Sequence, residues 1–246
     1  MVLSSLVDAP SGGHALCPLV SIIMPALNEE KTVGKLVLEI SSLMSSNHIP
    51  FEVIVVDDSS SDKTYYEALR CGAVVLRNDR NGGKGYCLRR GLEKARGDLI
   101  VMMDSDGEHL PTDIMRLLSE AFRGLDVVSG SRFMNGESSS TSRIHFVGNQ
   151  IFNLVIFILT GKTVTDSQTG LRILKRKVID ALHLESNGFE IETEITVKSL
   201  KNGFSFKEVP ISIRRREYGV SRVRMLSDGR RILRTIVTSS LSEVGH

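Results

Sequence analysis

The stretch from Asp98 to His109, with the sequence DLIVMMDSDGEH, constrains the fold of this chain more than any other. Its apolar run, Leu99 to Met103, is typical of a strand that is buried on both faces. Three carboxylates follow at every second position, namely Asp104, Asp106 and Glu108. If the chain stays extended through Ser105, the alternation along a strand points the first two carboxylates in the same direction.

Carboxylates that converge at the end of a buried strand repel one another unless a cation lies between them. Hard oxygen ligands favour Mg²⁺ or Mn²⁺, and such ions usually bridge to phosphate oxygens. The alternative is a solvated acidic turn that caps the next helix, because Asp-x-Asp alone is a common pattern. The rest of the chain has to decide between these two interpretations.

Composition narrows the class of protein. The chain has 246 residues, of which 41% are hydrophobic and 24% charged, an ordinary balance for one large or two small globular domains. Its net charge of +2 gives no indication of a nucleic-acid partner. Three widely spaced cysteines favour a reduced, cytosolic protein with neither a disulfide framework nor a zinc site.

The chain shows no pattern of a targeting or membrane-spanning segment. Residues 1–18 predict a flexible amino-terminal tail, because they lack the basic start and the long apolar core of a signal peptide. The longest apolar stretch, Ile151 to Leu159, is interrupted by Asn153 and falls short of the roughly 20 residues that a spanning helix needs. We therefore expect residues 19–246 to form a single domain that is soluble or peripheral to a membrane.

Apolar runs and helical patterns alternate along the first half of the chain. Strands are predicted at Leu19–Met24, Phe51–Val56, Ala73–Leu76, Leu99–Met103 and Asp126–Gly130. Helices are predicted at Glu29–Met44 with Asn28 as N-cap, before Ala73, from the Gly82–Gly85 region to Ala95, and at Pro111–Phe122. This order predicts an α/β fold with a mostly parallel central sheet flanked by helices.

The pattern changes after residue 130. A helix is predicted from Arg143 to Leu159, and its broad apolar face either packs on the sheet or lies partly in a membrane surface. The further expected elements are a turn at Asp166–Gly170, a strand at Leu171–Leu174, two helices of which the second covers Ile191–Lys201, a strand at Phe204–Arg214, a basic loop at Arg214–Arg222 and a helix at Met225–Val237.

Polar segments follow several predicted strands at the ends where open α/β sheets bind ligands. The segment Asp57–Thr64 either offers a carboxylate to a base or ribose, or caps the next helix. The segment Asn81–Gly85 places three glycines around Lys84, which fits either a phosphate cradle or a plain flexible turn.

Seven motifs occur in one order along the chain. They are PALNEE at Pro25, VVDDSSSD at Val55, GGKG at Gly82, MDSDGEH at Met103, SGSRF at Ser129, DSQTG at Asp166 and REYGVSR at Arg216. With these motifs the chain resembles the family 2 glycosyltransferases of the GT-A fold, and among them the polyprenyl-phosphate glycosyltransferases that include dolichyl-phosphate mannose synthases. The resemblance implies a GT-A nucleotide-binding fold with a nucleotide-binding half at 19–130 and a carboxyl-terminal acceptor-side half at 131–246.

The resemblance also implies roles for single residues. Positions assigned to the nucleotide are Pro25, Leu27, Glu29, Asp58, Lys84, Asp104 and Ser105. Positions assigned to the metal are Asp104, Asp106 and Glu108, the last of which stands where these enzymes often carry Gln. Positions assigned to catalysis are the metal-side Asp106, then Arg132 and Arg143 near the sugar and the acceptor phosphate, and Arg216 over the diphosphate. Arg222 replaces a common Lys.

The activity that the resemblance implies is metal-dependent, inverting transfer of a sugar to dolichyl or polyprenyl phosphate, with Mg²⁺ or Mn²⁺ as cofactor. The donor would be GDP-mannose, a UDP-hexose or a UDP-N-acetylhexosamine. A phosphate monoester, with a second pKa of about 6, is largely ionised at neutral pH and can attack the anomeric carbon without a protein base. We expect a cytoplasmic protein that is peripheral at the cytosolic face of the membrane.

Two other function classes stay open. A glycosyltransferase of the same fold with a soluble acceptor would need a carboxylate base near the sugar, and Glu192 or Glu194 could serve. A non-catalytic nucleotide-sugar-binding module is the other class. The complete set of carboxylates and arginines counts against it, because a pure binder needs no site for an acceptor phosphate.

Overall fold

The computed structural model describes residues 17–134, 143–218 and 225–241. The predicted tail as far as residue 16, the loop at Ser138–Ser142 and the segment Gly219–Arg222 of the basic loop lie outside these ranges.

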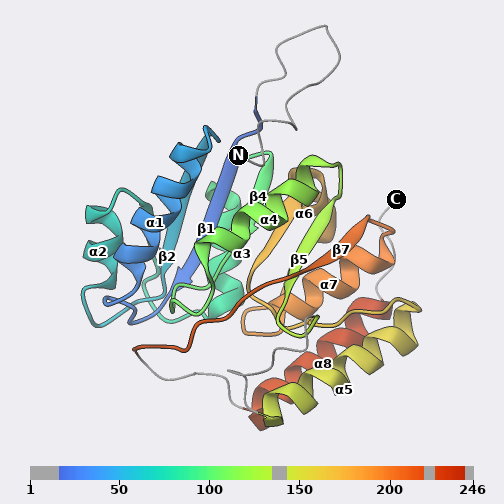
Figure 1. Ribbon diagram of the computed structural model, residues 1–246. Helices are drawn as coiled ribbons and strands as arrows, with labels where there is room; N and C mark the ends of the chain where they lie inside the picture. The colour runs from blue at the N-terminus through green and yellow to red at the C-terminus, as the bar shows by residue number, and fades with distance from the viewer. Residues whose placement is uncertain (1–16, 135–142, 219–224, 242–246) are drawn as a thin grey trace, which may run out of the picture.

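A single β-sheet forms the centre of the molecule (Figure 1). Its strands are β1 (Val20–Ala26), β2 (Phe51–Asp57), β3 (Val74–Arg77), β4 (Leu99–Met102), β5 (Val127–Ser131), β6 (Arg172–Lys175) and β7 (Phe206–Pro210). In the described residues these seven strands lie in the order β3-β2-β1-β4-β6-β5-β7. Strand β6 runs antiparallel to β4 and β5, whereas the other neighbours pair in parallel. The predicted α/β fold with a mostly parallel sheet is therefore confirmed.

Helices cover both faces of the sheet. They are α1 (Val33–Ser46), α2 (Thr64–Arg70), α3 (Lys84–Lys94), α4 (Pro111–Phe122), α5 (Arg143–Thr160), α6 (Arg176–Leu182), α7 (Ile191–Lys201) and α8 (Met225–Leu241). Successive strand residues point to opposite faces, so Ile22 packs with α1, α2 and α4, while Ile23 packs with α3, α6 and α7. This is why the strands consist of continuous apolar runs.

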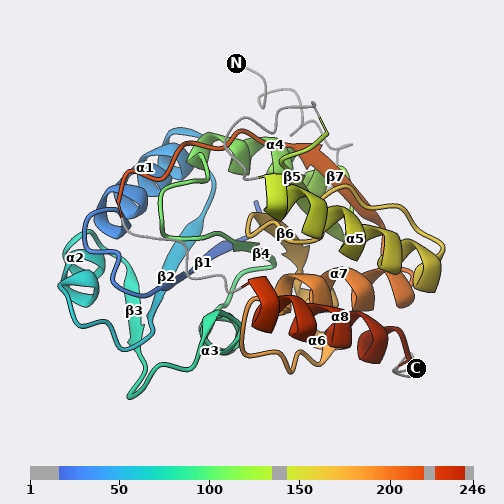
Figure 2. The ribbon, with the colours of Figure 1, turned by 90° about the horizontal axis from the view of Figure 1, so that it is seen from below.

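Helices α5 and α8 lie side by side below the sheet (Figures 1 and 2). They pack on each other and on α7 through a small cluster that consists of Ile156, Val164, Val197, Ile232 and Ile236. The apolar face of α5 therefore packs mainly on other helices, and Phe206 of β7 adjoins the same cluster. The α5 side chains Asn149 and Asn153 hold the carbonyl oxygen of Thr165, at 3.1 and 2.8 Å.

Two other predicted elements differ from the structure. Helix α1 begins at Val33 rather than Glu29, because Asn28 adopts a left-handed conformation with φ 55° and accepts a hydrogen bond from the Ser61 N–H at 2.8 Å. Asn28 is therefore not its N-cap. The strand predicted at Phe204–Arg214 ends at Pro210, and the chain then leaves the sheet.

The reversed direction of β6 determines what gathers at the carboxyl ends of the parallel strands. Its first residue, Arg172, pairs with Met102 at the end of β4 and with Ser129 in β5. The turn that precedes β6 therefore lies beside the segment that follows β4 (Figure 2), and Gly170 of this turn lies against the Asp104 carboxylate.

Asp126, directly before β5, links this strand to the segment before β7 and to α6. Its carboxylate accepts hydrogen bonds from the Ser205 hydroxyl at 2.9 Å and lies 2.8 Å from Lys177 Nζ. Burial opposes ionisation, but Lys177 and Ser205 outweigh it and lower the pKa of Asp126 from 3.8 to about 2. Ionised Asp126 therefore stabilises the fold above pH 4, and this contribution is lost as the pH falls toward 2.

We expect Asp126→Asn to lower the free energy of unfolding by about 1 kcal/mol at pH 7, since the ion pairs lie near the surface. Urea unfolding between pH 7 and pH 2 measures this, and the difference from wild type should shrink below pH 4. Asp180→Asn, on the exposed side of α6, is the matched control. A difference that stays constant down to pH 2 would contradict the role of the charge.

Candidate active site

The carboxylates after β4 do not keep the alternation of a strand. β4 ends at Met102 and the chain bends from Ser105 to Gly107, where Gly107 has a φ of 80°. The expectation that the chain stays extended through Ser105 is therefore wrong. Asp104 turns toward α3, whereas Asp106 contacts a segment that follows β7.

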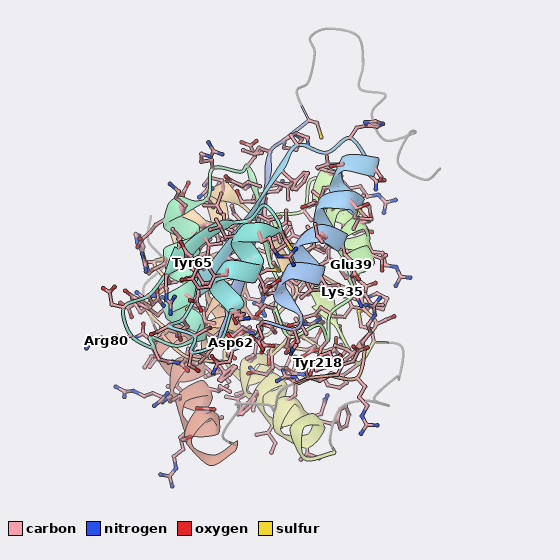
Figure 3. The ribbon with its side chains drawn as sticks, turned by 90° about the vertical axis from the view of Figure 1, so that its left-hand side faces the viewer. Lys35, Glu39, Asp62, Tyr65, Arg80 and Tyr218 are labelled. Carbon is pink, nitrogen blue, oxygen red and sulfur yellow. The ribbon has the colours of Figure 1, made fainter. Side chains whose placement is uncertain are left out.

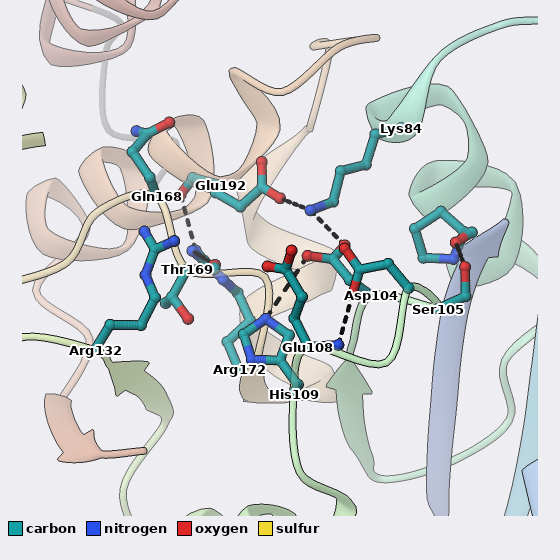
Figure 4. A network of polar contacts seen from close by, with 12 residues as sticks. Lys84, Asp104, Ser105, Glu108, His109, Arg132, Gln168, Thr169, Arg172 and Glu192 are labelled. Carbon is teal, nitrogen blue, oxygen red and sulfur yellow. Dashed lines mark hydrogen bonds and ion pairs between the residues drawn. The ribbon is translucent and has the colours of Figure 1, made fainter. Parts of the chain in front are cut away.

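Asp104 is held by a buried bridge of charges (Figure 4). Lys84 Nζ lies 2.5 Å from Asp104 Oδ1 and also contacts Glu192 Oε1, and His109 Nε2 lies 3.7 Å from Asp104 Oδ2. Burial alone would raise the pKa of Asp104, but Lys84 and His109 outweigh it and hold that pKa well below its usual range. For Glu192 burial prevails and raises the pKa. Asp104 is therefore ionised, and the Lys84 ammonium links two elements across the site.

The GGKG segment is neither a flexible turn nor an isolated loop. The Gly82 and Gly83 N–H groups donate to the carboxylate of Asp58 at 2.8 and 2.9 Å. Gly83 has a φ of 92°, and a Cβ on Gly85 would collide with the backbone of Ser186. The glycines are needed because the loop packs directly on the backbone before α7, which brings Lys84 to Asp104. Asp58 does not cap the next helix, because α2 begins at Thr64, but Asp62 of the same polar segment accepts a hydrogen bond from the Thr64 N–H at 2.9 Å.

The end of β1 and the loop after it carry three of the residues predicted to contact the nucleotide and lie against Ser105, which is a fourth. The Ser105 hydroxyl donates to the carbonyl oxygen of Pro25 at 2.7 Å, and the Thr32 hydroxyl donates to the carbonyl oxygen of Ser105 at the same distance. Glu29 donates its N–H to Thr64 Oγ1 at 2.7 Å. The residues predicted for the nucleotide therefore lie around the carboxyl ends of β1, β2 and β4, and Leu27 is half-buried in the same loop.

Arg132, predicted to lie near the acceptor phosphate, follows β5 and forms a two-point contact with buried Asp166. Its Nε and Nη2 lie 2.6 and 2.8 Å from the two carboxylate oxygens. Asp166 belongs to the turn before β6, and the next glycine in that turn, Gly170, lies so close to Asp104 that a Cβ there would overlap the carboxylate. Arg143 begins α5, but its side chain, like Arg222, lies outside the described residues.

Arg216 contacts the two remaining carboxylates. Its Nε lies 3.0 Å from Glu108 Oε1, and its Nη2 contacts Asp106 Oδ2. Burial alone would lower the pKa of Arg216, but Asp106 and Glu108 outweigh it and raise that pKa. The structure thus brings Arg216 to the residues predicted for the metal.

A fully buried arginine, Arg172, is a site residue that the sequence analysis missed. Its Nη2 donates to the carbonyl oxygen of Thr169 at 2.6 Å, and its Nη1 donates to that of Glu192 at 2.8 Å. It thus joins the turn beside Asp104 to the start of α7, and its charge offsets the buried carboxylates around it. An arginine within the apolar run LRILK was the available signal.

The two candidate bases are in different surroundings. Glu192 is buried between Lys84 and the turn, and within the described residues its Oε2 has no hydrogen-bond partner. Glu194 accepts hydrogen bonds from the N–H groups of Glu185 and Ser186, at 3.0 and 2.9 Å, and pairs with Lys198. Glu194 therefore holds the loop before α7, and only Glu192 of the two faces the site.

The predicted metal ligands have suitable chemistry but are paired with side-chain cations. Carboxylate oxygens are the ligands that Mg²⁺ and Mn²⁺ prefer. Among the residues that the structure describes, however, no three His, Cys, Asp or Glu side chains are grouped so that they could hold a metal ion. Asp104 pairs with Lys84 at the start of α3, whereas Asp106 pairs with Arg216 in the segment after β7. A site with both carboxylates and basic groups suits a ligand that carries phosphates and a cation.

Comparisons with known proteins agree with this architecture. The family model described as Glycosyl transferase family 2 matches residues 21–182. An uncharacterized protein of Methanocaldococcus jannaschii is 32% identical over 229 residues, covering 89% of this chain and 91% of that protein. A UDP-N-acetylglucosamine–dolichyl-phosphate N-acetylglucosaminyltransferase of Methanococcus voltae is 30% identical over 228 residues, covering 83% and 89% of the two chains.

Solved structures show the same fold. Glucosyl-3-phosphoglycerate synthase from Mycobacterium tuberculosis, solved with Mn²⁺, UDP and phosphoglyceric acid, superposes with a TM-score of 0.72 at 21% identity. The match covers 92% of this chain and 80% of that one. The predicted GT-A fold is confirmed by this likeness.

Gly170 offers a test of the geometry around Asp104. In Gly170→Ala the new methyl group must push the Asp104 carboxylate out of its position, because the methyl group and the carboxylate would overlap. We expect binding of UDP or GDP, measured by calorimetry, to weaken on the order of tenfold, or about 1.4 kcal/mol. Gly148→Ala in α5, where a Cβ meets open space, should leave binding unchanged. Equal binding by both variants would show that the position of Asp104 does not matter.

Proposed function

Because the chain belongs to glycosyl transferase family 2, we propose that this glycosyltransferase moves a sugar from a nucleotide-sugar donor to a polyprenyl phosphate such as dolichyl phosphate. The observation that carries the proposal is the joint placement of carboxylates and basic side chains at one edge of the sheet. The Methanococcus relative, which is named as a dolichyl-phosphate transferase, supports the acceptor class.

The donor is proposed to lie along the carboxyl ends of β1, β2 and β4. Pro25, Leu27, Glu29, Asp58, Lys84, Asp104 and Ser105 are the proposed nucleotide contacts. Asp58 Oδ1 already accepts hydrogen bonds from the Gly82 N–H and from Asn78 Nδ2, whereas Oδ2 accepts one from the Gly83 N–H, so Oδ2 is the oxygen proposed to contact the ligand. Lys84 and Arg216 supply positive charge for the diphosphate.

A divalent cation, Mg²⁺ or Mn²⁺, is proposed to bind Asp104, Asp106 and Glu108. When bound, it would offset the charge that builds up on the departing nucleoside diphosphate. The presence of Mn²⁺ and UDP together in the structure of the mycobacterial synthase supports this part of the proposal.

The transfer needs no protein base when the acceptor is a phosphate monoester. One of its ionised oxygens forms a bond to the anomeric carbon while the bond from that carbon to the nucleoside diphosphate breaks. A single displacement inverts the anomeric configuration. The residues proposed to place the acceptor phosphate in line are Arg132 and Arg143, since a guanidinium group matches phosphate in two-point geometry.

A soluble acceptor with a hydroxyl nucleophile is the second candidate. The observation that favours it is the buried position of Glu192, which faces the site beside Lys84. Burial raises the pKa of Glu192, which brings its basicity nearer to that required for removing a proton. The mycobacterial structural neighbour was solved with phosphoglyceric acid, a soluble compound.

The decisive assay offers GDP-mannose, UDP-glucose and UDP-N-acetylglucosamine with either dolichyl phosphate or phosphoglyceric acid. We expect sugar transfer to dolichyl phosphate from one of these donors. Transfer to phosphoglyceric acid alone would overturn the lipid acceptor and favour the soluble one. Transfer to neither, with intact nucleotide binding, would count against both acceptors.

The metal ligands can be tested in the same assay. Asp104→Ala and Asp106→Ala should each lower the rate on the order of 10²-fold or more, because the charge on the leaving group loses its partner. EDTA should abolish transfer, and added Mg²⁺ or Mn²⁺ should restore it. Full activity in EDTA would contradict the metal requirement.

We propose that the protein reaches its lipid acceptor from the cytosolic face of the membrane through α5 and α8. None of the helices, as far as the described residues reach, combines the length and apolarity needed to span a bilayer. The side chains exposed on this pair include Val147, Ile151, Leu154, Phe157, Ile158, Leu233 and Val237. The exposed Arg230, Arg231 and Arg234 of α8 would add attraction to anionic lipid.

Flotation with phosphatidylcholine–phosphatidylserine vesicles tests this contact. Leu154 and Ile158 are 58% and 68% exposed on one side of α5. The variant in which both are changed to Ser should no longer float with the vesicles but should still bind nucleotide. Leu38 and Leu69, 55% and 51% exposed on α1 and α2, give the matched double Ser control. The proposal fails if both double variants float as wild type does.

A further inference from the structure

A segment after β7 crosses the site, and we call residues Ile211–Tyr218 the arginine strap. Its Ser212 N–H donates to Asp113 Oδ2 at 2.9 Å, and its Arg214 N–H donates to the carbonyl oxygen of Glu108 at 2.8 Å. Figure 1 shows the strap as the red-orange trace that runs from β7 below the strands toward α1. Its backbone is thus fixed beside the carboxylate turn as far as Arg214.

The far end of the strap lies on the α1 side of the molecule. Arg214 Nη1 lies 3.9 Å from Glu39 Oε2 of α1, and Figure 3 shows Tyr218 below the same helix. Arg215, Glu217 and Tyr218 are exposed, whereas Arg216 is half-buried. Arg216 therefore differs from its neighbours in pointing into the site.

The guanidinium of Arg216 is the group that neutralises two of the proposed metal ligands. Its Nη2 contacts Asp106 Oδ2 and its Nε lies 3.0 Å from Glu108 Oε1, with the three side chains 20%, 13% and 34% exposed. Among the ion pairs of the described residues, Asp106 and Glu108 are paired with Arg216 and with no other cation. Asp104, by contrast, keeps Lys84 as its partner.

We propose that Arg216 is an exchangeable counter-ion, which occupies Asp106 and Glu108 in the donor-free enzyme and moves to the donor diphosphate when the divalent cation takes its place. The inference rests on the proposed function, and it adds the order of events at the same site. A guanidinium and a divalent cation on the same pair of carboxylates would repel each other, so one must leave before the other binds.

The exchange makes cation and nucleotide binding cooperative. A cation alone must displace Arg216 into solvent, whereas a cation that arrives with a diphosphate gives the arginine a new anionic partner. Binding of either ligand therefore increases the affinity for the other, as in any positive coupling between two sites. The strap suits this exchange, because within the described residues Arg214 is the last strap residue whose backbone donates a hydrogen bond to the carboxylate turn.

Replacing Arg216 should have opposite effects on the binding of Mn²⁺ alone and on the binding of nucleotide in the presence of Mn²⁺. A purely structural role of Arg216 would not give this pattern. We expect Arg216→Ala to bind Mn²⁺ alone on the order of tenfold more tightly than wild type, because the competing charge is gone. With saturating Mn²⁺, the same variant should bind UDP or GDP on the order of tenfold more weakly, because a phosphate contact is gone.

The experiment measures free Mn²⁺ by electron paramagnetic resonance, and nucleotide binding by calorimetry, with the full chain. Arg215→Ala, at the exposed neighbouring position, is the matched control and should change neither affinity. Arg216→Lys should fall between wild type and Arg216→Ala in both measurements, since it keeps the charge but loses the planar fork. Thermal unfolding of each variant verifies that the fold is intact.

The outcomes separate this inference from the proposed function. Normal Mn²⁺-dependent nucleotide binding by wild type, with Mn²⁺ affinity unchanged or weakened in Arg216→Ala, overturns the exchange and leaves the proposed function standing. No Mn²⁺ binding by wild type with either nucleotide overturns both the exchange and the metal-dependent part of the proposed function.

Discussion

The bridge from Asp104 through Lys84 to Glu192 is the interaction on which the rest of the site depends. It joins the loop after β4, the start of α3 and the start of α7, three segments far apart in the chain. A buried pair of carboxylates around one ammonium is stable only if all three groups are held in place, because removal of one leaves an uncompensated charge. The glycines of the GGKG loop, the close approach of Gly170 and the hydrogen bonds of Arg172 all serve this placement.

Strand β6, which runs antiparallel to its neighbours, makes that placement possible. In a fully parallel sheet the turn before β6 would lie at the opposite edge, away from the carboxylates. Its reversal brings Asp166 to Arg132 and the Arg172 side chain between β4 and α7. The residues proposed for the donor and those proposed for the acceptor therefore lie at the same edge, which suits the proposed reaction between two phosphorylated substrates.

Much of this follows from local patterns, and the exceptions have physical causes. Continuous apolar runs such as Ile22–Met24 predicted the buried strands, because burial on both faces removes the polar alternation. The predicted start of α1 and the predicted end of β7 were wrong. The left-handed conformation of Asn28 and the departure of the chain from the sheet at Pro210 depend on partners distant in sequence. The contacts of Arg172 and Arg216 could not be predicted, because they depend on the antiparallel pairing of β6 and on the path of the strap.

The central claim is that Lys84 and Arg216 neutralise the carboxylates of this site as long as no donor is bound. When the donor binds together with a divalent cation, that cation neutralises Asp106 and Glu108 in place of Arg216. The most direct measurement is a crystal structure of the full chain with Mn²⁺ and the nucleoside diphosphate that it binds. We expect Mn²⁺ against Asp106, the Arg216 guanidinium on the diphosphate, and Gly170 and Arg172 unmoved. A diphosphate bound away from the carboxylates, with Arg216 still paired with Asp106, would contradict the claim.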